Sequence, residues 1–144
     1  MIYRHEHPVL VAEANDQEFD FIAEALHEAD YLNPLRRVVT GKQCLELLRA
    51  SHEVMPALIL LDLNLTGMDG REALIEIKQA PDLCDLPVVI LSASSHPRDI
   101  EFCYRHGANS YHLKPLETPI FKRIVKEIAG YWLDAAVLPR KALL

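Results

Sequence analysis

The sequence predicts a three-layer α/β fold, in which a doubly wound sheet of five parallel strands lies between two layers of helices. Two observations predict this fold class. Short, continuously apolar runs alternate along the chain with longer segments whose apolar residues recur at helical spacing. The connecting segments are also long enough for right-handed crossovers between parallel strands. We therefore expect the chemistry at the carboxyl ends of the strands, where ligands bind in such sheets.

The first half of the chain predicts three strands and two helices. Phe19, Ile22 and Leu26 recur at helical spacing after a short apolar run. The run that ends before Asp62 is apolar throughout, which is typical of a strand buried on both faces. The expected elements are strand Val9–Ala12, helix Asp16–Ala29, strand Leu35–Val39, helix Gln43–Ala50 and strand Ala57–Leu61.

The second half predicts two more strands and three helices. Pro97 suits the first turn of a helix that stops at Gly107. Thr118 and Pro119 predict the cap and first turn of the last helix. The core face of that helix is expected to carry Ile120, Ile124, Ile128 and Trp132. The expected elements are helix Gly70–Gln79, strand Pro87–Leu91, helix Arg98–His106, strand Ser110–Leu113 and a helix from Thr118 to about Leu133.

The length of 144 residues predicts one domain without a separate output domain. We expect residues 1–130 to form this domain and residues 131–144 to form a C-terminal extension. The extension carries more apolar surface than one domain buries with a single helix face. We therefore expect a dimerisation arm that pairs with its equivalent in a two-fold homodimer. Its candidate residues are Tyr131, Trp132, Leu133, Val137, Leu138 and Pro139.

Composition argues against several functional classes. The net charge of −6 offers no basic face for nucleic acid or for an anionic membrane. No apolar stretch approaches the roughly 18 residues of a membrane span, and the first residues lack the apolar core of a signal peptide. The three cysteines are widely spaced in apolar runs, which favours a reducing compartment. We expect a cytoplasmic protein.

Polar side chains follow the predicted strands at the point where each strand ends. Glu13 follows the first strand, Asp62 the third, Ser92 the fourth and Lys114 the fifth. A carboxylate in this place can accept a phosphoryl group if a divalent cation and a fixed positive charge offset the developing negative charge. Mg²⁺ prefers hard oxygen ligands, which Glu13, Asp62 and the backbone carbonyl of Asn64 can supply.

Three segments resemble signatures of the response-regulator receiver family. They are Leu60–Gly70 (LLDLNLTGMDG), Pro87–Ala93 (PVVILSA) and Gly107–Pro115 (GANSYHLKP). The resemblance covers nearly the whole chain and implies a flavodoxin-like fold. It also implies that Asp62 is the phospho-acceptor, Lys114 the phosphate-pairing lysine, Ser92 the switch hydroxyl and Tyr111 the switch aromatic. The positions that tune phosphoryl hydrolysis in the family are occupied by Asn64 and Ser94.

A narrower resemblance concerns the C-terminus. Tyr131–Pro139 (YWLDAAVLP), Asn33–Pro34 and Asp69–Glu72 are similar to segments of the single-domain response regulators of cyanobacterial and bacterial phytochromes. This resemblance implies a sensor histidine kinase of the phytochrome class as partner. It also implies a stand-alone response regulator whose tail reaches a second protomer.

One position departs from the family pattern. Receiver domains usually carry two adjacent acidic residues after the first strand, whereas this chain has Glu13 followed by Ala14. Two carboxylates and one ammonium then leave a local charge of −1, which predicts weak Mg²⁺ binding and inefficient phosphorylation. Asp16 is interpreted as a helix cap rather than as a replacement ligand.

Two alternative functions therefore stay open. The missing acid favours an adaptor of receiver fold that binds its partner without phosphorylation. An enzyme of flavodoxin-like architecture is the other alternative, although the chain has no Gly-rich phosphate loop and no nucleophile–histidine pattern. As a receiver, the chain is expected to be a phospho-acceptor and not an enzyme, with at most self-catalysed phosphotransfer from its donor and dephosphorylation.

Overall fold

The computed structural model describes residues 6–50, 52, 54–67 and 69–139. Within these residues, five strands form one parallel sheet in the order β2-β1-β3-β4-β5, which confirms the predicted fold class. The elements are β1 (Val9–Ala12), α1 (Asp16–Glu28), β2 (Leu35–Val38), α2 (Gly41–Arg49), β3 (Leu58–Leu61), α3 (Gly70–Gln79), β4 (Val88–Ser92), α4 (Pro97–Arg105), β5 (Ser110–Leu113), α5 (Thr118–Ala129) and a π-helix, η2 (Gly130–Ala135).

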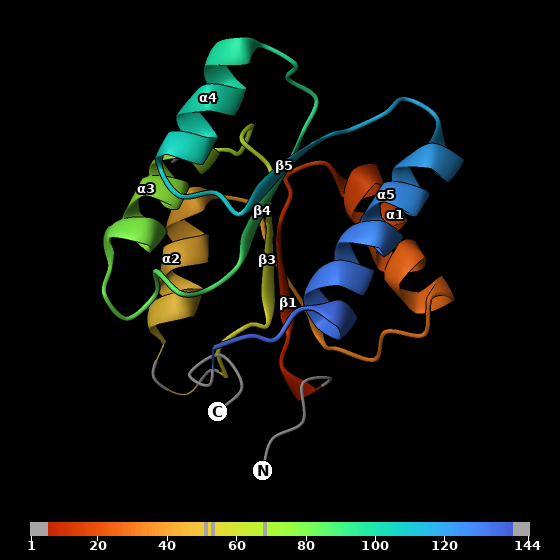
Figure 1. Cartoon of the computed structure of the whole chain (residues 1–144), viewed down its shortest axis with the longest axis horizontal. Helices are drawn as coiled ribbons and strands as arrows, with labels where there is room; N and C mark the ends of the chain where they lie inside the picture. The colour runs from red at the N-terminus through yellow and green to blue at the C-terminus, as the bar shows by residue number, and fades with distance from the viewer. Residues whose placement is uncertain (1–5, 51, 53, 68, 140–144) are drawn as a thin grey trace.

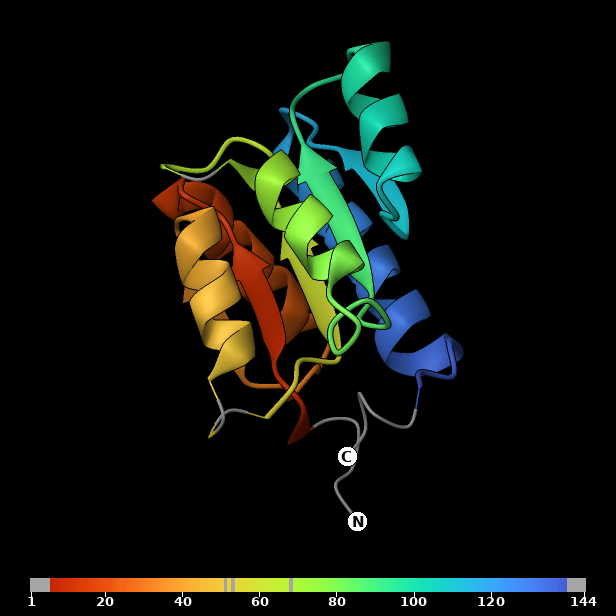
Figure 2. The same cartoon turned by 90° about the vertical axis from the view of Figure 1, so that its left-hand side faces the viewer.

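Helices cover both faces of the sheet. Helices α2, α3 and α4 lie on one side and α1 and α5 on the other (Figures 1 and 2). Each face of the sheet has its own hydrophobic core, and β1 contributes to both because side chains alternate across a strand. Leu10 packs with the α2–α3 layer, and Val9 and Val11 pack with the α1–α5 layer. The four residues of β3 are all buried, as its apolar sequence predicts. The edge strands β2 and β5 are partly exposed.

The last helix differs from its prediction in its length and in which of its faces is buried. It ends at Ala129, and the chain continues as η2. Phe121 and Val125 are buried together with the predicted Ile128. The other predicted core residues, Ile120, Ile124 and Trp132, are only partly buried. Apolar residues occur on both stripes, so packing against α1 decides between them; Phe121 meets Phe21 edge-on at 6.2 Å between ring centroids.

The start of the last helix is also corrected. Glu117, not Thr118, is the N-cap residue, and its side chain makes no capping hydrogen bond. Pro119 lies in the first turn, as predicted. The bounds of the other elements differ from prediction by at most two residues.

The segment after α5 packs partly on its own domain. Leu133 and Leu138 are buried in the core between α1, α5 and the sheet. Asp134 accepts a hydrogen bond of 2.7 Å from the hydroxyl of Tyr31. Tyr131 and Val137 stay exposed, at 58% and 91% of their surface. The segment leads back toward the amino ends of the central strands (Figure 1). Residues 140–144 lie outside the described part of the chain.

No helix among the described residues is long and apolar enough to cross a membrane.

Candidate functional site

A cavity of about 590 Å³ opens at the carboxyl ends of the strands. The parallel register brings these ends together, because Ala12 of β1 pairs with Leu61 of β3 and Ser92 of β4 pairs with Leu113 of β5. The cavity is lined by Glu13, Ala14, Asn15, Glu18, Asp62, Leu63, Asn64, Arg71, Ser92, Ala93, Ser94 and Lys114. Residues predicted from four separate strand ends therefore share one site. Tyr111 lies beside it and does not line the cavity.

Lys114 is the centre of the site. Its side chain is 6% exposed, and its ammonium lies 2.7 Å from Glu13 Oε1, 2.6 Å from Glu18 Oε2 and 2.9 Å from Asp62 Oδ2. The contacts with Glu13 and Asp62 join residues that the sequence analysis placed at one sheet edge. The contact with Glu18 was not predicted. With Glu18 included, three carboxylates surround one ammonium, so the count of two carboxylates was too low.

The charges in this site depend on one another. Burial lowers the pKa of Lys114, but its hydrogen bonds to Glu13 and Glu18 and the charge of Asp62 outweigh burial and raise the pKa overall. The ammonium therefore stays protonated at neutral pH. Burial raises the pKa of Glu13 to about 7, and the charge of Asp62 adds to this effect, although the hydrogen bond to Lys114 opposes it.

Asp62 is held by the backbone that surrounds it. Its Oδ1 accepts the Asn64 amide hydrogen at 3.2 Å, while Oδ2 accepts from Lys114. The amide of Gly70 donates to the Leu63 carbonyl at 3.1 Å, and this brings the first turn of α3 against the loop. A Cβ atom at Gly70 would lie 2.2 Å from the Asp62 carbonyl oxygen. Only glycine fits at this contact.

The β1–α1 loop is ordered by Asn15 and Arg37. Asn15 caps α1, because its Oδ1 accepts the Glu18 amide hydrogen at 2.9 Å. The interpretation of Asp16 as the cap was therefore wrong. Asp16 instead pairs with Arg37 at 2.7 Å, and its side chain is 90% exposed. The Arg37 guanidinium also donates to the Glu13 carbonyl oxygen at 3.1 Å.

A hydrogen-bonded chain leads from Ser92 to helices α3 and α4. Ser92 Oγ accepts the Ser94 amide hydrogen at 3.1 Å, and the Tyr111 hydroxyl donates to the Ser94 carbonyl oxygen at 2.7 Å. The Ser94 hydroxyl donates to Asp99 at 2.5 Å, and Asp99 pairs with Arg71 at 2.7 Å. These bonds hold the pKa of Asp99 below its usual value, with the Ser94 bond contributing most. Arg71 and Asp99 were not predicted from the sequence; they lie on different helices.

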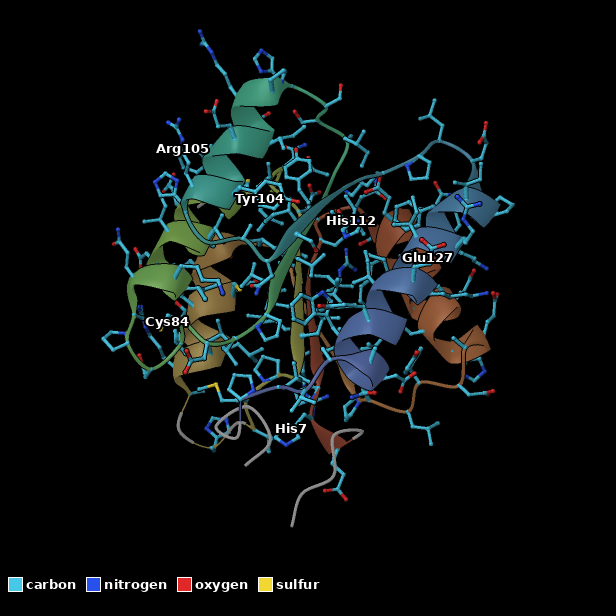
Figure 3. The ribbon with its side chains drawn as sticks, in the orientation of Figure 1. His7, Cys84, Tyr104, Arg105, His112 and Glu127 are labelled. Atoms are coloured by element: carbon cyan, nitrogen blue, oxygen red, sulfur yellow. The ribbon has the colours of Figure 1, made fainter. Side chains whose placement is uncertain are left out.

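Other polar side chains lie away from this edge. Figure 3 shows His7 at the opposite end of the sheet, where its Nδ1 lies 2.9 Å from the Met55 carbonyl oxygen. His112 of β5 and Glu127 of α5 lie beside each other in the same view and line a separate cavity of about 390 Å³. Neither place joins the acidic edge.

The fold and this arrangement define the receiver class of signalling domains. The chain belongs to the response regulator receiver domain family, whose model matches residues 9–126. It is a receiver-domain response regulator of two-component signalling, related to the phytochrome response regulators.

Two curated relatives illustrate the similarity. The chain is 36% identical over 129 residues to the probable methanogenesis regulatory protein FilR2 of Methanothrix harundinacea, covering 87% of this chain and 83% of the relative. It is 44% identical over 84 residues to the response regulator Rcp1 of Synechocystis sp., covering 58% of this chain and 57% of that protein.

Two solved structures superpose closely. The phosphorylated cyanobacterial phytochrome response regulator RcpA matches with a TM-score of 0.87 at 36% identity, covering 93% of this chain and 99% of that chain. The Mn²⁺-bound form of Rcp1 matches with a TM-score of 0.87 at 32% identity, covering 92% of this chain and 99% of that chain.

Proposed function

We propose that this response regulator accepts a phosphoryl group from a sensor histidine kinase on Asp62. The single observation that carries the proposal is the position of the Lys114 ammonium, 2.9 Å from Asp62 Oδ2 at the floor of an open cavity. A buried carboxylate that faces such a cavity, beside an ammonium that is charged at neutral pH, can act as a nucleophile toward an electrophilic phosphorus.

Asp62, Lys114 and Ser92 have different roles in the phosphoryl transfer. An Asp62 oxygen forms a bond to phosphorus while the bond from phosphorus to the kinase imidazole nitrogen breaks, and the imidazole leaves. Lys114 offsets the negative charge of the transferred group. Ser92 Oγ already accepts the Ser94 amide hydrogen, which leaves its hydroxyl hydrogen to donate to a phosphoryl oxygen.

The carboxylates of the site suit a divalent cation. Glu13, Glu18 and Asp62 each offer an oxygen, and these three atoms lie within 4.8 Å of one another. Hard oxygen donors are those that Mg²⁺ and Mn²⁺ prefer. When bound, such an ion neutralises charge on the phosphoryl oxygens. Mn²⁺-bound Rcp1 supports the presence of a cation site in this subfamily.

The signal is proposed to leave through Tyr111 and α4. A hydrogen bond from the Ser92 hydroxyl to a phosphoryl oxygen would shift the loop that contains Ser94. This loop also holds the Tyr111 hydroxyl and, through Asp99, the contact between α4 and Arg71. A change at Asp62 therefore biases a connected set of hydrogen bonds between two arrangements.

Acetyl phosphate with Mg²⁺ and a phosphate-affinity gel tests the proposal. We expect a shifted band for the native chain and none for Asp62→Asn. The matched control is Asp20→Asn, which removes an exposed carboxylate of α1 and leaves the band intact. An equal band in Asp62→Asn contradicts the proposal.

A phytochrome-class kinase is the proposed donor, and a homodimer the proposed assembly. Similarity to RcpA and Rcp1 supports the donor class.

The exposed Tyr131 and Val137 support an intermolecular contact, whereas Leu133 and Leu138 are already buried in their own domain. Light scattering of Tyr131→Ser with Val137→Ser is expected to show a monomer. A dimer mass for this variant contradicts the arm. A cytoplasmic location is also proposed, because none of the three cysteines, Cys44, Cys84 and Cys103, forms a disulfide among the described residues.

An adaptor that acts without phosphorylation is the second candidate, because Ala14 removes one acidic side chain from the site. Absence of the shifted band in the native chain, together with retained kinase binding, favours the adaptor.

A further inference from the structure

We propose that Glu18 is a direct ligand of the divalent cation in this chain. It replaces the acidic metal ligand that other receiver domains usually carry at the position of Ala14. This inference rests on the proposed function, because the cation serves the phosphoryl transfer to Asp62. It assigns a metal-binding part to a residue whose place in the sequence indicates only helix capping.

The site already surrounds a positive charge with oxygen atoms. The Lys114 ammonium contacts one oxygen each of Glu13, Glu18 and Asp62, and the shortest of these contacts is the one to Glu18, at 2.6 Å. One ammonium neutralises only one of three carboxylates, so a net negative charge remains even when Glu13 carries a proton. The remaining charge favours a further cation, and the donors are all hard oxygens.

Glu18 is the carboxylate with an oxygen to spare. Glu13 uses Oε1 for Lys114 and Oε2 for the Asn15 amide, at 3.2 Å. Asp62 uses Oδ2 for Lys114 and Oδ1 for the Asn64 amide. Glu18 uses Oε2 for Lys114, while its Oε1 accepts no hydrogen bond from any described residue. Its side chain lines the cavity and is 34% exposed, so a hydrated ion can reach that oxygen.

The local backbone explains why Glu18 is available. Asn15 and Glu18 have the spacing of a capping box, in which the glutamate side chain usually returns to the backbone N–H of the cap residue. Here the Asn15 N–H donates to Glu13 instead. Only one half of the box forms, in which Asn15 Oδ1 accepts the Glu18 amide hydrogen. The Glu18 carboxylate is thereby directed to the cavity, and α1 fixes its position.

Mn²⁺ titration followed by electron paramagnetic resonance tests this ligand without any phosphorylation step, because the signal reports the free ion. Glu18→Gln keeps the shape of the side chain and removes its charge. We expect it to weaken Mn²⁺ binding about tenfold or more, because loss of a partner that only orients a metal ligand already costs about tenfold or more. Asp20→Asn is the charge control, since Asp20 is exposed on the same helix and does not line the cavity; we expect its affinity within about twofold of native.

A double-mutant cycle with Ala14→Asp separates direct ligation from general charge. If Glu18 replaces the missing acidic ligand, Glu18→Gln reduces the Mn²⁺ affinity much less in the Ala14→Asp background than in the native one. Equal losses in both backgrounds overturn the proposal, and so does native affinity in Glu18→Gln or absence of Mn²⁺ binding by the native chain. Failure of the proposed function is distinguishable: Mn²⁺ binding then depends on Glu18, but Asp62 takes no label.

Discussion

Replacement of Gly70 by alanine is expected to damage both stability and the site. The new Cβ atom would lie 2.2 Å from the Asp62 carbonyl oxygen and 2.7 Å from the Leu63 Cα atom, whereas ordinary contacts begin near 3.4 Å. Both neighbours are backbone atoms, so no side-chain rotation relieves the clash. The first turn of α3 and the loop that contains Asp62 have to separate by about 1 Å.

The expected loss is at the upper end of the range for overpacking, about 3 kcal/mol. For a domain of this size, that loss lowers Tm by about 6–12 °C. The shift also displaces Asp62 relative to Lys114, and a displacement of about 1 Å at a reacting atom can slow transfer about 100-fold. Circular dichroism melting and initial rates of acetyl phosphate labelling measure the two effects.

Gly130→Ala is the matched control. Gly130 has right-handed helical angles of −60° and −39°, and the nearest atom to its Cβ would be the Tyr31 hydroxyl oxygen, at 3.7 Å. Alanine there restricts the unfolded chain and is expected to raise stability by about 0.5–1 kcal/mol. A Gly70→Ala chain that melts with native Tm, or a Gly130→Ala chain that loses as much as Gly70→Ala, refutes the steric argument.

Three further changes test the site and its surroundings. Because burial raises the pKa of Glu13 to about 7, the native state holds this proton more tightly than the unfolded chain, so stability falls as pH rises from about 5 to 8. Glu13→Gln, which cannot ionise, should remove a fall of about 2 kcal/mol from urea unfolding curves over that range; an unchanged pH slope contradicts it. Asn15→Ala removes the α1 cap and should cost about 1 kcal/mol in the same assay, whereas native stability would show that the cap is not needed. Asp99→Asn weakens the bonds to Ser94 and Arg71 and should speed amide hydrogen exchange at the start of α4; native exchange there argues against a link between these elements.

Much of the fold could be predicted because the information is local. Continuous apolar runs mark strands buried on both faces, and β3 is where this is clearest. The last helix shows the limit of this reasoning. Two apolar stripes compete on it, and only the position of α1 decides that Phe121 and Val125 are buried while Ile120 is not.

The acidic site was predictable as far as the strand ends define it. Topology alone brings Glu13, Asp62 and Lys114 to one edge. Glu18 could not be found in this way, because it lies in a helix and has the spacing of a capping residue. The ion pair of Arg71 with Asp99 joins residues of two helices that no local pattern relates. Only the structure shows that the Asn15 N–H donates to Glu13, which leaves the Glu18 carboxylate free to reach the cavity.

Identification of the modified residue tests the central claim most directly. Borohydride reduction after acetyl phosphate treatment converts an aspartyl phosphate to homoserine, which tandem mass spectrometry locates in the sequence. We predict homoserine at position 62, in a Mg²⁺-dependent yield, and none in Lys114→Ala or Asp62→Asn. Homoserine at another aspartate, or none at any position in a chain that keeps its native fold, contradicts the assignment of Asp62 as the phospho-acceptor.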